Sequence, residues 1–502
     1  MLPDLQPLNA LYLQCFLLVA THYYPHTSGV GLANFVLRKF LSLNPEPIMT
    51  PTALKPTLML RGRWYALLAA TALLSSAPAN ALPSYAQQTG LPCAQCHSIG
   101  FGPALTAYGR QFKLNAYALG AHNKSVPLAL MAVVGQTRTS SDLPEAPEHY
   151  STNNNFALNE LTGFIAGRIG SHAGAFIEAA YSGTERHTAW GAFDVRYARN
   201  FTVGGHGIVG GITLNNNPTV SDLWNSTPVW SFPYTGSELA PTPGAAPILF
   251  DGISETVLGP TFYAMIDDRL YIEAGGFKSL SDSLLDNVGL SADDNSHVKG
   301  IAPYWRAALQ FTNGPHYFSV GLLGLNVKQQ PDSASPLTNR FNDFGFDATY
   351  QHTAVDSSNL QANLSIVHES RHLDAAVSAE EAASASGSLD SRKLDVSWTY
   401  KQTWVAAGGI FDTSGSSDGG LYAPGEVDGS NNGKPDSRGY LVQLEYVPFG
   451  KMNSPYRPWL NVRVGLQYIG YSRFNGGNSN YDGFGRSAGD NNTLFGFVWV
   501  AL

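Results

Sequence analysis

The sequence is poor in charged residues, which make up only 14% of its 502 residues. A soluble domain usually carries about 25%. Aromatic residues account for 12% of the chain, and it contains 51 glycines. This combination argues against an ordinary soluble protein and favours a membrane β-barrel. The formal net charge of -8 and the sequence pI near 5.9 also argue against nucleic acid as a partner.

Cysteine is scarce as well, and two of the three cysteines stand in the string Cys93-Ala94-Gln95-Cys96-His97. The pattern C-x-x-C-H is the attachment signature of a c-type haem, in which both thiols bond to the haem vinyl groups and the following His ligates the iron. A redox disulfide or half of a zinc site would leave His97 unexplained. A zinc site would also need more ligands than Cys15, the remaining cysteine, can supply. The sequence therefore predicts one covalent haem c, held by Cys93, Cys96 and His97.

A short helix is expected after this string. Gly102-Pro103 marks its start, an apolar face runs from Leu105 to Leu119, and Gly120 closes it. Arg110 and Lys113 lie off that face. We expect them to pair with the haem propionates, with ordinary solvated helix charges as the alternative.

The second axial ligand of the iron has several candidates. His122 follows the helix-closing glycine and could fold back over the ring, whereas Met131 lies in an apolar segment. We prefer His122 to Met131 by a small margin. Met265, Met452 and an open position are the other options.

Long apolar runs are almost absent outside one export signal. Met49 or Met59 opens this signal. Lys55, Arg61 and Arg63 form its basic region, and an apolar stretch from Trp64 to Ser76 and the small-residue cleavage site Ala79-Asn80-Ala81 follow. Residues 1–81 are therefore predicted to be an upstream extension and a secretory signal, with mature protein from Leu82. Haem is attached to exported cytochromes outside the cytoplasm, so signal and motif agree. No other run is long enough for a membrane-spanning helix.

From Val126 to the end, apolar and polar residues alternate with period two, which predicts β-strands. We count about 16 of them, an even number typical of outer-membrane barrels. Short turns alternate with long polar connections. The clearest strands are Phe176 to Tyr181, Trp190 to Tyr197, Phe262 to Ile266, Tyr317 to Val327, Leu394 to Tyr400, Tyr440 to Val447, Trp459 to Tyr468 and Thr493 to Leu502. The long connections, expected outside the cell, are Arg138 to Asn154, Asn216 to Ile253, Ser279 to Gly300, Lys328 to Arg340, Arg371 to Asp390, Thr413 to Ser437 and Ser472 to Asn491.

The predicted fold class is thus all-β: an outer-membrane β-barrel over residues 126–502, with a small α-helical c-type cytochrome segment over residues 82–125. An even strand count places both barrel termini in the periplasm. A segment of about 44 residues is near the size below which a chain cannot bury a core alone. We therefore expect the haem segment to pack into the barrel mouth, with a free-standing mini-domain as the alternative.

The string from Leu82 to Leu114 resembles the fused outer-membrane cytochrome-porins that oxidise extracellular ferrous iron. In that family P-x-[FY]-A-x-Q-T-G precedes C-x-x-C-H, and L-T-x-[FY]-G-R-x-F-K-L follows it; here Pro83 to Gly90 and Leu105 to Leu114 match. Leu214 to Val220, with Leu223-Trp224-Asn225 and Thr227-Pro228, is similar to a loop of the same group. Gln87 and Asn115-Ala116-Tyr117 depart from the family pattern without touching the iron ligands.

The resemblance implies an outer-membrane protein that passes electrons from an extracellular donor, Fe(II), through one haem to a periplasmic c-type cytochrome or other acceptor. If it is an enzyme, it is an oxidoreductase of the ferrous iron type. The alternative is a solute porin whose haem segment acts as a gate or sensor. No separate catalytic residues are assigned. Acidic residues of the long connections suit an incoming ferrous ion, although they also simply solvate loops: Asp142, Glu145, Glu148, Asp293, Asp294, Glu380, Glu381, Asp418, Glu426 and Asp428.

Overall fold

The computed structural model describes residues 84–120, 127–227, 230–250, 252–290, 297–451, 453–456 and 459–502. The predicted extension and signal, His122, Met452, Asp293 and Asp294 lie outside the described residues. Everything described belongs to one compact unit, Pro78–Leu502.

Strands form a single closed wall. Of the 17 strands in the described part of the chain, β8 (His297–Val298) has only two residues, and the other sixteen build an antiparallel β-barrel. β1 pairs with β2 on one side and β17 on the other, which closes the barrel. The long strands are β1 (Leu128–Thr139), β2 (Asn155–Arg168), β3 (Ala173–Ser182), β4 (His187–Val203), β5 (His206–Asn215), β6 (Val257–Ile266), β7 (Leu270–Ser279), β9 (Ala302–Asn313), β10 (His316–Gln330), β11 (Asn339–Thr353), β12 (Asn359–Leu373), β13 (Ser386–Tyr400), β14 (Trp404–Gly415), β15 (Ser437–Tyr446), β16 (Asn461–Arg473) and β17 (Thr493–Ala501). The prediction of about 16 antiparallel strands is confirmed.

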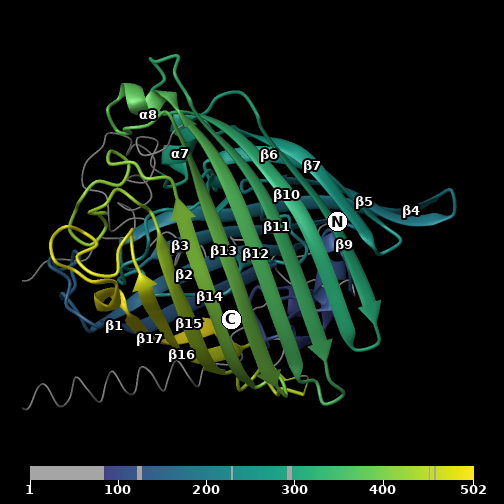
Figure 1. Ribbon diagram of the computed structural model, residues 1–502. Coiled ribbons are helices and arrows are strands. Elements are labelled where there is room, and N and C mark those ends of the chain that lie inside the picture. Colours follow the sequence, from purple (N-terminus) through teal and green to yellow (C-terminus); the bar gives the residue numbers. More distant parts are fainter. Residues whose placement is uncertain are drawn as a thin grey trace, which may run out of the picture. The chain divides into compact units, whose positions relative to one another are not determined.

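The two ends of the barrel differ, as the sequence predicts. Consecutive strands lie side by side around the wall (Figure 1). At one end they are joined by tight turns, such as the one between Arg168 and Ala173, and β1 begins and β17 ends there too. At the other end lie the long connections, which carry α7 (Asp282–Asn287), α8 (Asp374–Ser378) and the 3₁₀ turn η3 (Ala488–Asn491). Short periplasmic turns and long external loops are the arrangement of bacterial outer-membrane barrels.

The outer face of the wall is apolar. Large side chains such as Phe262, Ile410 and Leu444 remain 57–62% exposed. At the short-turn end, exposed aromatic residues pair across strands: Trp404 lies 4.4 Å from Tyr446 between ring centroids. An apolar band with aromatic residues at its edge fits a lipid environment. Among the described residues, no helix is both long and apolar enough to span a membrane.

The inner face of the wall is polar and yet buried. Arg463 is 0% exposed, Glu369 0% and Gln467 1%. In an open channel such inward side chains would face water. Their burial shows that protein fills much of the barrel interior.

One piece of that filling is the segment before β1. It contains α4 (Ser84–Thr89), α5 (Cys93–Cys96) and α6 (Ala107–Leu114). Helix α6 is shorter than predicted, because Ala116 and Tyr117 both have positive φ values, 55° and 56°, which a right-handed helix cannot contain. The predicted closing residue Gly120 also has a positive φ but lies beyond this earlier end.

The other piece is the connection from Asn216 to Thr256, between β5 and β6, which includes η2 (Ile248–Phe250). The sequence predicted a long external loop here. The connection does leave from the long-connection end as predicted, but it is not a free external loop, because this connection (the inward segment) folds into the barrel. Its backbone oxygen at Thr235 accepts a hydrogen bond from Gln467 Nε2 (2.9 Å), and Leu249 N donates to Asp343 Oδ2 (2.8 Å). Inward polar side chains from opposite parts of the wall therefore hold it inside the barrel.

Candidate functional site

The C-x-x-C-H string forms one helical turn. Its two cysteines lie on α5, and His97 ends the turn by donating its backbone N–H to Cys93 O (2.9 Å). Neither cysteine is in a disulfide. Helix α6 packs closely on this turn, since a Cβ added at Gly109 would lie 2.2 Å from Cys96 O. Only glycine allows that approach.

The electrostatic surroundings do not suit a redox dithiol. Burial raises the pKa of the Cys93 thiol to about 11 and that of Cys96 to about 12. Reactive and zinc-binding cysteines need lowered values, because the thiolate is the active form. His97 is partly exposed by area, but loss of hydration lowers its pKa to about 4. At neutral pH it carries the uncharged imidazole that can ligate iron.

These residues fit a covalent haem c. The Nδ1 atom of His97 is buried without a hydrogen-bond partner, although the backbone of Gly102 and Ala104 also contacts the ring. Both thiols are free and one turn apart. Cys93 and Cys96 would carry the two thioethers, His97 would ligate the iron, and the group would supply one-electron redox chemistry. No cluster of three or more His, Cys, Asp or Glu suited to a metal ion occurs in the described ranges.

The residues just after the motif pack on the barrel wall at its short-turn end. Ile99, Phe101 and Ala104 share an apolar cluster with residues of β1, β14 and β17, including Trp499. Arg463 of β16 donates to Phe101 O, and its guanidinium lies 4.8 Å from the Phe101 ring centroid. Ser98 Oγ donates to Gln361 Oε1 of β12 (2.9 Å). The haem string is thus fixed in the barrel mouth, as the sequence predicts.

Arg110 and Lys113, the expected propionate partners, point toward the barrel interior. Arg110 donates to Gln351 Oε1 of β11 (2.9 Å), and its guanidinium carbon lies 3.6 Å from the Tyr317 ring centroid. Lys113 Nζ donates to Asp222 O (2.5 Å) and Asn225 Oδ1 (2.8 Å) of the inward segment. These contacts give both side chains a structural role, and propionate pairing stays a prediction.

The end of the haem segment is held by charged residues of the wall. Tyr117 OH donates to Asp194 Oδ2 (2.5 Å), and the same oxygen accepts a hydrogen bond from Arg196 Nε (2.6 Å). Tyr263 OH donates to Leu114 O (2.9 Å). Asp194 and Arg196 were not predicted from the sequence as functional residues. The sequence did contain a sign of them, because both are charged residues at inward positions of β4.

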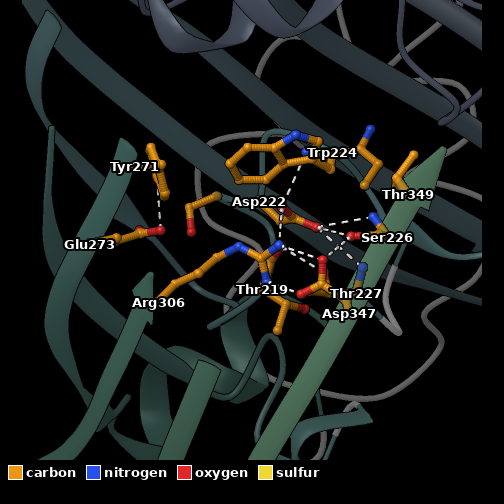
Figure 2. Close-up of polar contacts among 12 residues, drawn as sticks. Thr219, Asp222, Trp224, Ser226, Thr227, Tyr271, Glu273, Arg306, Asp347 and Thr349 are labelled. Atoms are coloured by element: carbon orange, nitrogen blue, oxygen red, sulfur yellow. Dashed lines mark hydrogen bonds and ion pairs between the residues drawn. The ribbon is translucent and has the colours of Figure 1, made fainter. Parts of the chain in front are cut away.

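Asp222 organises the inward segment (Figure 2). Its carboxylate accepts hydrogen bonds from the backbone N–H groups of Trp224, Ser226 and Thr227, at 3.0 to 3.2 Å. Arg306 of β9 contacts it at 3.3 Å and also pairs with Asp347 of β11 at 2.8 Å. Burial alone would raise the pKa of Asp222, but Arg306 and Lys113 beside it hold that pKa below its usual value. Ion pairs and hydrogen bonds therefore join the wall, the inward segment and the haem segment in one network.

Two other sets of predicted residues can be placed. Met131 of β1 points inward near the cysteines, and Met265 of β6 is buried against the end of the haem segment. Among the loop acids, Asp418 accepts backbone N–H groups of Ala383, Ser384, Gly420 and Leu421, so it ties two external loops together. Glu145 and Glu148 are exposed.

Neither a protein-family model nor a curated protein matches this sequence. Several solved structures resemble the chain at low identity. Salmonella typhi OmpF in complex with daunomycin has a TM-score of 0.43 at 12% identity, covering 75% of this chain and 97% of that one. Pseudomonas putida OprB has a TM-score of 0.42 at 12% identity, covering 74% and 92%. Vibrio cholerae OmpT, an outer membrane protein, has 0.36 at 10% identity, covering 74% and 95%. The pairing of the chain's own strands, and not these likenesses, establishes the barrel.

Proposed function

We propose that the protein is an exported cytochrome-porin of the bacterial outer membrane, carrying electrons from extracellular ferrous iron through one covalent haem to a periplasmic c-type cytochrome. The observation that carries this proposal is the position of Cys93, Cys96 and His97. They lie in the short-turn mouth of a barrel whose outer face is apolar. Such a mouth faces the periplasm.

The filled lumen favours electron transfer over solute passage. Inward side chains from several strands are fully buried, and the inward segment crosses the interior. A solute channel needs water where these residues have protein neighbours. A haem carrier needs only a route for electrons and a fixed haem.

The short-turn end, where electrons would leave the protein, is also accessible to a periplasmic partner. Cys96 and His97 keep part of their surface exposed, and Ala107 at the start of α6 is exposed. A haem attached there would have an edge that an acceptor protein can approach from the periplasm.

The test is to mix the purified haem-loaded protein with ferrous iron and record the haem absorption spectrum. Mass spectrometry of the mature chain should first show the addition of one haem. We expect ferrous iron to reduce the haem, and His97→Ala to abolish the reduction. His368→Ala is the matched control, because His368 is an exposed residue paired with Asp390 on the outer surface.

The external carboxylates should affect only the rate. Glu145→Gln combined with Glu148→Gln should slow reduction, more so at low ionic strength, because salt screens exposed charges. Reduction by another extracellular donor but not by ferrous iron would refute the iron assignment alone. If no external donor reduces the haem, a solute porin with a haem-bearing gate replaces the electron conduit.

A further inference from the structure

Three residues on adjacent strands form a row beside the haem motif. Met131 of β1 lies directly opposite Ala501 of β17, and Ala501 lies opposite Asn461 of β16. Residues paired in this way point to the same face of a sheet, and neighbouring strands are about 4.8 Å apart. Asn461 is 1% exposed and contacts Gly100 O from inside the barrel. Met131 therefore points inward, about 10 Å along the row from Asn461.

Cys93 lies against this row. The side chain of Asn461 hydrogen-bonds the Cys93 thiol. Cys93 and Met131 also pack against the same apolar cluster, which includes Phe101 and Trp499. Met131 is only partly buried although it points inward. Its side chain thus has room to move in the mouth that holds the cysteines.

We propose that Met131 is the second protein ligand of the haem iron, to which it would bind through its thioether sulfur. This rests on the proposed haem attachment. A methionine side chain is unbranched and flexible, so it can reach from a strand to a metal beside the wall. Thioether ligation raises a haem potential, which suits a haem that must take electrons from ferrous iron. The barrel wall would then supply the second ligand of the iron, and the haem segment would supply only the first, His97.

Met265 provides a matched control. It also points inward near the short-turn end, but it packs against Leu114 and Ala116, at the far end of the haem segment from the cysteines. Its neighbours across the strands are Val209 and Tyr271. A substitution there changes the same side chain in the same mouth without reaching the haem motif.

The experiment is spectroscopy of the haem-loaded full chain. The ferric wild-type protein should show the far-red absorption band of a thioether–iron bond, and the reduced protein a strongly upfield methionine methyl proton signal. Met131→Leu should lose both, bind carbon monoxide readily and show a lower reduction potential. Met131→His should restore a six-coordinate, low-spin haem without the band. Met265→Leu and His122→Ala should keep the band and the methyl signal.

The outcomes separate this inference from the proposed function. Absence of covalent haem in the wild type would refute the function itself. Covalent haem without the thioether band, or a band that persists in Met131→Leu, would refute Met131 alone. If Met131→Leu does not fold, the shifted methyl signal is assigned with methyl-labelled methionine in the other two methionine variants. Persistence of the shifted signal in both Met265→Leu and Met452→Leu assigns it to Met131, and its loss in either overturns the proposal.

Discussion

Lys113 illustrates how a single residue connects the haem segment to the barrel. The pKa of its amine is lowered to about 7, first by burial and then by Arg196, against the opposing effect of Asp222, Asp194 and Glu273. The ammonium nonetheless donates to Asp222 O and Asn225 Oδ1. A cation held in this way makes the docking of α6 dependent on pH.

The direction of that dependence follows from the proton balance. The undocked chain, with an ordinary lysine pKa near 10.4, binds more protons than the docked chain between pH 7 and pH 10. Docking should therefore strengthen as pH rises through this range. Hydrogen exchange of residues 105–117, corrected for intrinsic rates, should slow by up to about tenfold per pH unit. Lys113→Met should remove the dependence, whereas equal slopes in wild type and variant would contradict it.

At the scale of elements, the packing of α6 on the haem string depends on Gly109. A Cβ there would lie 2.2 Å from Cys96 O and 3.1 Å from Leu105 Cδ2, so backbone must move. Gly109→Ala should reduce haem attachment strongly while the barrel still folds. Haem content per folded barrel, separated by heat-modifiable mobility on gels, is the measurement. Gly170→Ala, in a turn with nothing within 4 Å of the added Cβ, should leave haem content unchanged; an equal loss would show that α6 packing is not the cause.

The elements that the sequence predicts well are those governed by local pattern. Period-two alternation gave the strands, and turn chemistry placed the tight connections such as Gly170-Ser171-His172. The C-x-x-C-H spacing predicts haem attachment because the chemistry itself fixes that spacing, and the attachment stays a prediction. The length of α6 was missed because Ala116 and Tyr117 adopt left-handed backbone that nothing local announces.

The inward segment could not be predicted by the same means. It has no regular alternation of apolar and polar residues, although aromatic residues such as Trp224 and Phe232 distinguish it from the more polar connections. Its direction depends on distant partners. Arg306 of β9 pairs with both Asp222 and Asp347, and Gln467 of β16 donates a hydrogen bond to Thr235 O. These contacts form only when the wall closes and brings distant strands together, so the local periodicity of the sequence does not predict them. Asp194 and Arg196 are different, because their charges at inward positions of β4 could have been noticed in the sequence, but their partners Tyr117 and Ser221 lie in other segments.

At the scale of the whole molecule, two protein segments obstruct one lumen in series. Residues 84–120 occupy the short-turn mouth, and the inward segment crosses the interior. They also contact each other, since Asn225 Nδ2 donates to Pro103 O (2.6 Å) and Lys113 Nζ donates to Asp222 O (2.5 Å). Each segment also has its own contacts with the wall, through Ser98 and Gln361 for residues 84–120 and through Leu249 and Asp343 for the inward segment.

Obstructions in series make a definite prediction for ion conductance, because the narrower remaining one limits the current. Deleting residues 84–120 should raise single-channel conductance in planar bilayers only slightly, and replacing residues 220–250 by a short turn should do the same. The double variant should conduct several times more than either, approaching an open barrel. Heat-modifiable mobility on gels verifies that each variant barrel is folded. If the first deletion alone conducts as well as the double variant, the inward segment does not close the lumen, and solute passage regulated by the haem segment becomes the better explanation of the molecule.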